Sequence, residues 1–309
     1  MERTGPVTGP ASGSNIMTDK DVQFVVHGPP GSAPPVLAQA FMKAVAQSGC
    51  DSRPWDIIDR GNDPGVDALA YLMEHAGEDN VLSTCTPVFI QAPIIRGMPV
   101  SVRDTTPLAR LVSDTFFLVV DTARGLRSIE DVVATMRGRK TRSAGYFLGG
   151  INHLLALALT QAVGAELDFT VVPDEPTVWR NLVAGRIDWG CGVIAEIQPY
   201  LESGELTVIG AFSPERSPRM PDVPTFSEAG LPVTFSMWRG IVGPPGLSAE
   251  QCARWDTIIR SAIGTPAWQA YLEDNGQADA FLPSEQFRHF LQQEWDWYDH
   301  HLKLAGVVK

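Results

Sequence analysis

The sequence predicts an α/β fold with largely parallel sheets, and three observations lead to this prediction. Short apolar runs typical of buried strands alternate with segments whose apolar residues recur at helical spacing. Loops rich in Gly and Pro separate the two kinds of segment. The chain of 309 residues is about as long as two domains, and its 44% hydrophobic and 19% charged residues are typical of a soluble globular protein. Strands that alternate with helices along a chain form mostly parallel sheets.

The first half of the chain begins with a strand at 23–26, a loop containing Gly28 and Gly31, and a helix at 36–46. Further strands are expected at 55–58, 81–84 and 116–120, and further helices at 67–75 and 128–136. Ser128 stands where it can cap the last of these helices. In the second half, helices are expected at 151–163 and 178–184, and strands at 169–172 and 206–210. From residue 249 onward the pattern predicts helices only, at 249–263, 266–274 and 283–303.

The net charge of −12 argues against a general binder of nucleic acids or anionic membranes, which would need a basic surface. This charge is unevenly distributed, because the segment 96–142 holds nine basic and five acidic residues. A small anion is therefore compatible with the composition as a ligand. Because no run of 18 apolar residues occurs, we expect no membrane insertion.

We expect neither a metal nor another cofactor. The four cysteines, at 50, 85, 191 and 252, show no C-x-x-C motif and no zinc spacing, and are interpreted as buried free thiols. Adjacent helical residues such as His300 and His301 point about 100° apart and cannot readily hold one ion.

Residues 1–20 are expected to form a disordered lead-in, since their first part is rich in Gly, Pro, Ser and Thr. This stretch lacks the basic start and the apolar core of a secretory signal. On that ground a cytoplasmic location stays open at this stage.

Two Gly-rich loops precede helices and are candidate anion sites, because the first amides of a helix attract negative charge. The first contains Gly28 and Gly31 but neither a Walker lysine nor a G-x-G-x-x-G motif, so an ordinary turn is an equally good interpretation. The second, at 145–153, follows the basic segment, so amides and positive charge are expected to converge there. His153 is interpreted first as a histidine bonded to a backbone carbonyl and second as a catalytic group. Asp188 ends an apolar run, and strand ends are where α/β proteins bind ligands.

From residue 104 onward the chain resembles a known family. The most specific stretch is PDVPTFSEAGLP at 221–232. Segments 104–109, 185–188 and 197–206 fit the same pattern. Single residues that fit it are Trp238, Gly240, Pro244, Gly246, Glu294, Tyr298 and Gly306. These motifs resemble the receptors of tripartite tricarboxylate transporters, the TctC or Bug solute-binding proteins, over about residues 22–309.

This resemblance implies a two-lobed fold of the type II periplasmic-binding-protein-like kind, a Venus flytrap in which two crossover segments join α/β lobes. The crossovers are expected near 119–123 and 236–240. Lobe 1 would comprise 21–120 and 239–309, and lobe 2 would comprise 121–238. Lobes of this kind close about a hinge on a small ligand.

The resemblance also implies a ligand-binding cleft that both lobes line. The matching positions in this chain are Gly28, Pro30, Gly31, Ser32, Ala33, Thr86, Gly149, Gly150, Asn152, His153 and Asp188. The chain departs from the family pattern near this cleft, where His27 replaces a proline and Glu175 lies near a lost lysine.

The function implied by the resemblance is capture of a small carboxylate in the periplasm and its presentation to membrane transporter subunits. Two alternatives belong to other classes. One is a cytoplasmic enzyme of lyase, isomerase or hydrolase type acting on a small acid, with His27 or His153 as general acid or base. The other is a cytoplasmic ligand sensor. We favour binding over catalysis, because the fold implies a ligand site more firmly than it implies a reaction.

Overall fold

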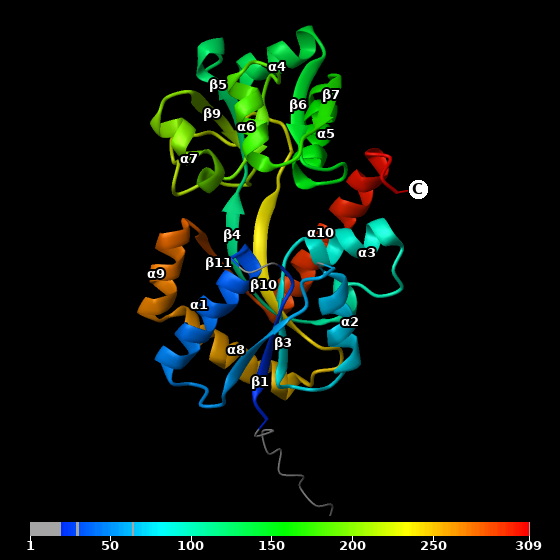
Figure 1. The fold of residues 1–309 in the computed structure, drawn as a ribbon, viewed down its shortest axis with the longest axis vertical. Coiled ribbons are helices and arrows are strands. Elements are labelled where there is room, and N and C mark those ends of the chain that lie inside the picture. The colour runs from blue at the N-terminus through cyan, green and yellow to red at the C-terminus, as the bar shows by residue number, and fades with distance from the viewer. Residues whose placement is uncertain (1–19, 29–30, 64, 309) are drawn as a thin grey trace, which may run out of the picture.

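The computed structural model describes residues 20–28, 31–63 and 65–308, and of residue 236 only the backbone. These residues form two lobes stacked along the longest axis of the molecule (Figure 1). Residues 1–19 of the expected lead-in at 1–20, and the predicted site residue Pro30, lie outside the described residues. Within the described part of the chain, no helix has both the length and the hydrophobicity that a bilayer span requires.

A mixed six-stranded sheet forms the centre of lobe 1, in the order β11-β4-β10-β3-β1-β2. Strands β2, β1 and β3 are parallel, whereas β10, β4 and β11 run antiparallel to their neighbours. The expected parallel arrangement is therefore wrong for half of this sheet. Two strands of this antiparallel half, β4 and β10, run toward lobe 2 (Figure 1). The strands are β1 (Val22–Val26), β2 (Trp55–Asp59), β3 (Val81–Cys85), β4 (Thr106–Thr115), β10 (Ser236–Gly243) and β11 (Ala278–Pro283).

Two groups of helices cover the two faces of this sheet. Helices α1, α8 and α9 pack on one face, in a core that includes Phe24 and Phe41. Helices α2, α3 and α10 cover the other face, in a core that includes Val25 and Phe89. Phe24 and Val25 enter different cores because successive side chains of a strand point to opposite faces. The helices are α1 (Ala33–Ser48), α2 (Val66–Glu74), α3 (Val88–Arg96), α8 (Ala249–Ile263), α9 (Pro266–Asn275) and α10 (Ser284–Leu304).

Lobe 2 contains two small sheets. In one, β5 (Phe117–Asp121) is antiparallel to both of its neighbours, β8 (Gly190–Gly192) and β9 (Leu206–Ala211). In the other, β6 (Thr141–Gly145) pairs in parallel with β7 (Leu167–Val171). The Asp188 amide donates to the Arg142 carbonyl at 2.8 Å and so links β6 to the segment that leads into β8. The helices are α4 (Ile129–Gly138), α5 (Ile151–Val163), α6 (Glu175–Val183) and α7 (Ile194–Glu202).

The first crossover between the lobes lies at Phe116, between the end of β4 and the start of β5. The predicted boundary after residue 120 differs from this position, because β5 pairs over its whole length within lobe 2. The apolar run 116–120 is uninterrupted and carries no turn residue, so the sequence offers no signal of the change of sheet. The second crossover falls between β9 and β10. The expectation of helices only after residue 249 is also wrong, since β11 pairs with β4.

Helix α10 extends from lobe 1 to lobe 2 (Figure 1). Leu302 in its last turn and Val307 beyond its end both lie against Gly149 of lobe 2. A Cβ atom at Gly149 would stand only 3.2 Å from Leu302 and 3.1 Å from Val307. The end of the described chain is therefore packed against the loop that leads into α5.

Candidate functional site

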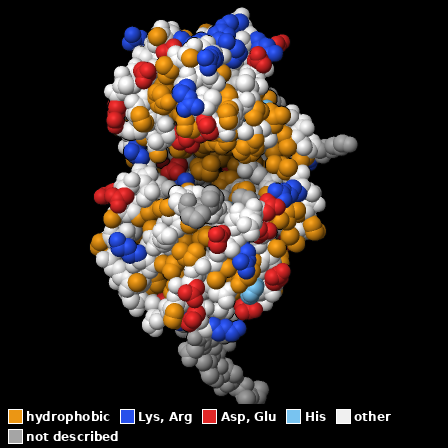
Figure 2. All heavy atoms as spheres, in the orientation of Figure 1, with side chains coloured by type: hydrophobic (Ala, Val, Ile, Leu, Met, Phe, Trp, Pro, Cys, Tyr) orange, Lys and Arg blue, Asp and Glu red, His pale blue; other side chains and the backbone are white. Residues whose placement is uncertain are grey.

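Figure 2 shows a hollow between the two lobes, bordered by many hydrophobic side chains. One hydrogen bond between the lobes joins two of the predicted site segments. The side chain of Gln91, on α3 of lobe 1, donates to the Gly149 carbonyl of lobe 2 at 3.5 Å. Helix α3 begins just after Thr86, whose carbonyl accepts from the Phe89 amide in the first turn. The structure therefore brings the Thr86 segment and the loop containing Gly149 together.

His27 joins the predicted loops of lobe 1 and is nearly inaccessible, with 3% of its surface exposed. Its Nδ1 lies 3.2 Å from the Thr84 hydroxyl and its Nε2 lies 2.9 Å from the Thr86 hydroxyl. Burial lowers the pKa of His27 to about 3, against a smaller opposing effect of a backbone hydrogen bond to Thr84. The imidazole is therefore neutral at ordinary pH, and both ring nitrogens are engaged. A general acid or base should have a pKa near the working pH, which His27 does not have. Its environment is instead that of a residue that positions Thr86.

The first loop offers few amide donors to an anion. Gly31 has a φ of 83°, and a Cβ atom at Gly28 would stand 2.6 Å from the Ser32 hydroxyl oxygen. Ser32 is the N-cap residue of α1, and Ala33 is its first helical residue. The next two residues, both prolines, have no N–H group, and the amide that follows them already donates to the Ser32 carbonyl. Of the first turn, only the Ala33 amide is left for a ligand.

The second loop presents a more complete helix N-terminus. Gly150 is the N-cap residue of α5, and no proline interrupts the first turn that follows. The Gly149 amide donates to Nδ1 of His153 at 3.0 Å, and burial lowers the pKa of His153. The expected partner of His153 was a backbone carbonyl, and the structure shows a backbone amide instead. The side chain of Asn152 donates to the Cys191 carbonyl at 2.6 Å and pins α5 to β8. Both polar side chains thus shape the loop, while backbone amides remain available at the start of α5.

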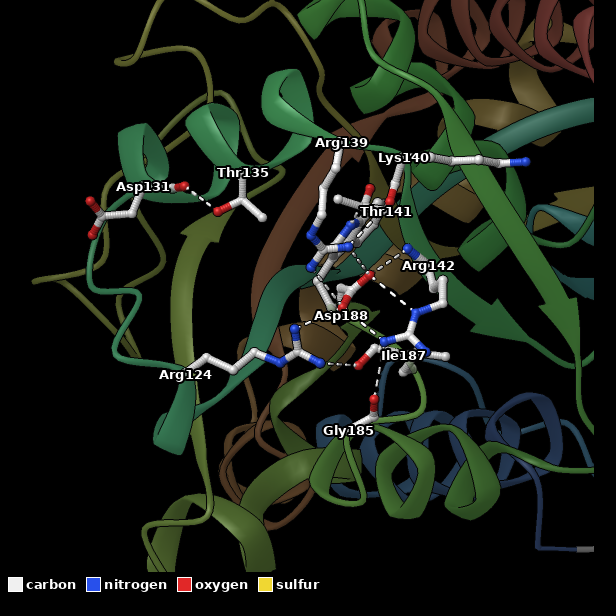
Figure 3. Close-up of polar contacts among 11 residues, drawn as sticks. Arg124, Asp131, Thr135, Arg139, Lys140, Thr141, Arg142, Gly185, Ile187 and Asp188 are labelled. Atoms are coloured by element: carbon white, nitrogen blue, oxygen red, sulfur yellow. Dashed lines mark hydrogen bonds and ion pairs between the residues drawn. The ribbon is translucent and has the colours of Figure 1, made fainter.

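Asp188 pairs with arginine side chains rather than with these residues, and Figure 3 shows it among its partners. It lies beside the first residues of β6, whereas the loop to α5 follows the last residue of that strand. The sequence suggested that Asp188 ends a strand, but in the structure it precedes β8. Its carboxylate accepts hydrogen bonds from Arg124 at 2.7 Å, from Arg139 at 2.9 Å and from the Arg142 amide at 2.8 Å.

This arginine cluster explains both the charge state of Asp188 and the fate of the basic segment. Burial by itself would raise the pKa of Asp188, but the hydrogen bonds from Arg139, Arg142 and Arg124 outweigh it and hold the pKa well below its usual range. The three arginines come from the segment 96–142, whose positive charge was expected to converge on the loop at 145–153. The structure directs these three side chains to Asp188 instead.

A group of acidic side chains that sequence reasoning largely missed lies at the strand ends of lobe 2. Tyr146 follows β6, Glu175 opens α6 after β7, and Glu196 lies in the first turn of α7 after β8. Burial raises the pKa of Glu196 to about 8, and the Glu175 carboxylate adds to the increase. Burial, with a smaller effect of Glu196 and Glu175, also raises the pKa of Tyr146. The signal for Glu196 is weak in the sequence because β8 is only three residues long.

Two α/β lobes joined by two crossovers, with a hollow between them, define a fold of the periplasmic-binding-protein-like class. The chain belongs to the TctC family, the tripartite tricarboxylate transporter family receptors, whose family model matches residues 70–303. Its predicted two-lobed α/β fold is thereby confirmed.

Known proteins agree with this assignment. The chain is 22% identical to Protein BugT of Bordetella pertussis over an alignment 313 residues long, which covers 99% of this chain and 93% of BugT. A TctC solute-binding protein from Polaromonas superposes with a TM-score of 0.85 at 19% identity, covering 92% of this chain and 98% of that one. The structure of R. palustris Rpa4515 with adipate superposes with a TM-score of 0.68 at 20% identity, covering 93% and 97%.

Proposed function

We propose that this protein binds a small carboxylate between its lobes and acts as the solute-binding receptor of a tripartite tricarboxylate-type transporter. The observation that carries the proposal is the meeting of the Thr86 segment with the loop before α5, joined by Gln91 and Gly149. The free amides at the start of α5 provide the positive pole that a carboxylate requires. The similarity in fold to a protein whose structure contains adipate supports the same class of ligand.

We assign binding rather than catalysis to this cleft. Burial holds the pKa of His27 and His153, the two histidines considered as acid–base groups, below the ordinary value. In each of them at least one ring nitrogen is already hydrogen bonded within the protein. A proton-transfer group works best when its pKa lies near the working pH, and burial moves the pKa of both histidines away from that value.

The ligand class is tested by thermal unfolding in the presence of acetate, succinate, adipate, benzoate and citrate. A ligand that binds only the folded protein raises the unfolding free energy by about 2.7 kcal/mol at a concentration of 100 times its Kd. We expect at least one of these acids to raise the melting temperature. Absence of a shift with all five would refute carboxylate binding.

The role of the loop before α5 is tested with His153→Ala. This variant removes the acceptor of the Gly149 amide, so the loop loses its fixed shape, and binding of the acid that responds should weaken by about tenfold, corresponding to one hydrogen bond. His289→Ala is the matched control, because His289 is exposed on α10 in lobe 1. Equal affinities of the two variants would contradict the assignment of the loop.

The receptor role and the periplasmic location are part of the same proposal. Cells that carry the transporter genes and this protein should accumulate the labelled acid, and cells without the protein should not. Cell fractionation should recover the native protein in the periplasm. Chemical conversion of the responding acid by the purified protein would favour the enzyme alternative.

A further inference from the structure

An exposed apolar pair lies within the proposed binding loop. Phe147 is 47% exposed and Leu148 is 57% exposed, and both lie between the end of β6 and the start of α5. Adjacent exposed hydrophobic side chains on a surface that borders a cleft are typical of a ligand contact. The hydrophobic border of the hollow in Figure 2 is consistent with such a surface.

The Phe147 ring lies directly over the helix terminus that would hold the carboxylate. A Cβ atom at Gly150, the N-cap residue of α5, would be 2.8 Å from the ring atom Cζ of Phe147. A carboxylate placed on the first amides of α5 therefore has the ring beside it. The next atoms of the ligand must either pack on this ring or displace it.

The groups around this pair do not suit a second negative charge. Tyr146 precedes Phe147, with the two ring centres 5.9 Å apart, and lies close to Glu175 and Glu196. Burial raises the pKa of both glutamates, so this wall of lobe 2 already disfavours negative charge, and a second carboxylate placed on it would be costly. On lobe 1, the buried His27 is neutral, and the first turn of α1 has lost two donors to proline.

We propose that the ligand of the cleft is a monocarboxylic acid with an apolar body, whose carboxylate lies on the start of α5 and whose body packs on Phe147 and Leu148. This inference rests on the proposed carboxylate binding and narrows its ligand class. Phe147 is the residue that determines specificity for the apolar body.

The test compares acids that differ in one feature at a time. Hexanoate and adipate have six carbons each and differ by one carboxylate, whereas acetate keeps the carboxylate of hexanoate without its body. Titration calorimetry of the full chain should give hexanoate an affinity at least 30-fold higher than that of acetate, because buried methylene groups add favourable transfer free energy. Hexanoate should also bind more tightly than adipate and citrate.

Variants of the apolar pair link this preference to the structure. Phe147→Ala and Leu148→Ser should each weaken hexanoate binding by about fivefold to tenfold and change acetate binding by less than twofold. Ile57→Ala is the matched control, because Ile57 is an exposed hydrophobic residue on β2 of lobe 1. Unchanged melting temperatures without ligand would show that the variants fold.

The outcomes separate the two proposals. Tighter binding of adipate or citrate than of hexanoate would overturn the apolar ligand class and leave carboxylate binding intact. Unchanged hexanoate binding in both Phe147→Ala and Leu148→Ser would overturn the role of the pair. Absence of binding by every acid would overturn both proposals.

Discussion

Replacing Asp188 with Asn is expected to destabilise lobe 2 and to leave ligand binding intact. The side chain of Asp188 is 2% exposed, and it is the shared partner of Arg124, Arg139 and Arg142. An asparagine side chain at this position would keep one acceptor oxygen but turn an NH2 group toward guanidinium donors. The substitution therefore removes the charge and takes one acceptor oxygen away from the donors that surround it.

The magnitude follows from how much of the cluster is screened by water. Removing one partner of a fully buried ion pair costs about 3–5 kcal/mol. Arg139 and Arg142 are 47% and 45% exposed, so they can recover solvation, whereas the Arg142 backbone amide loses a 2.8 Å bond. We therefore expect a loss of about 3 kcal/mol in the unfolding free energy, at the lower end of that range.

Urea unfolding followed by circular dichroism measures this loss. A decrease of about 3 kcal/mol lowers the midpoint by about 1 M urea for an m value of about 3 kcal/mol/M. Asp174→Asn is the control, because Asp174 caps α6, pairs with Arg180 at 3.6 Å in solvent, and Asn caps helices equally well. If Asp188→Asn were as stable as this control but bound the responding acid weakly, Asp188 would belong to the ligand site and the structural role would be refuted.

Three further predictions concern other buried groups. Burial raises the pKa of Glu294 to about 7, so its contribution to stability is present below its unfolded pKa and is lost as the pH rises through 7. Glu294→Gln should therefore reduce by about 2 kcal/mol the difference in unfolding free energy between pH 5 and pH 8, as measured by urea unfolding. The pKa of His27 is lowered to about 3, so its contribution to stability is present above its unfolded pKa and is lost as the pH falls toward 3. Its imidazole NMR signals should therefore not shift between pH 8 and pH 5. A titration midpoint in that range would contradict the burial of His27. Gly192→Ala would place a Cβ atom 2.4 Å from the buried Trp179 ring and should cost about 1–3 kcal/mol, while Gly138→Ala, with nothing within 4 Å, should not; equal melting temperatures would show that the Trp179 ring yields.

The strands and helices with a strong local signal are the ones that the sequence predicts well. The apolar run before His27 forms β1, and the segment after Gly150 forms α5 as expected. Helices α3 and α7 escape prediction because each is short and contains a proline, Pro93 or Pro199. Strand β8 is too short to show a period at all.

The candidate site shows the same division between local and distant information. The Gly-rich stretch before α5 is visible in the sequence, because glycines before an apolar helical segment form a local pattern. The partners of Asp188 are 46 to 64 residues away from it, so only the fold shows that they converge on this carboxylate. The exposure of Phe147 is equally a property of the fold, since hydrophobic residues are usually buried.

The path of α10 has a practical consequence for every binding experiment on this protein. Leu302 and Val307 lie against Gly149, so the carboxyl end of the described chain is next to the proposed ligand loop. Strand β1 begins at the end of lobe 1 that faces away from lobe 2 (Figure 1). An affinity tag, fluorophore or surface linkage is therefore best attached ahead of β1. The same addition after α10 would stand next to the proposed ligand loop and could change the affinity that is being measured.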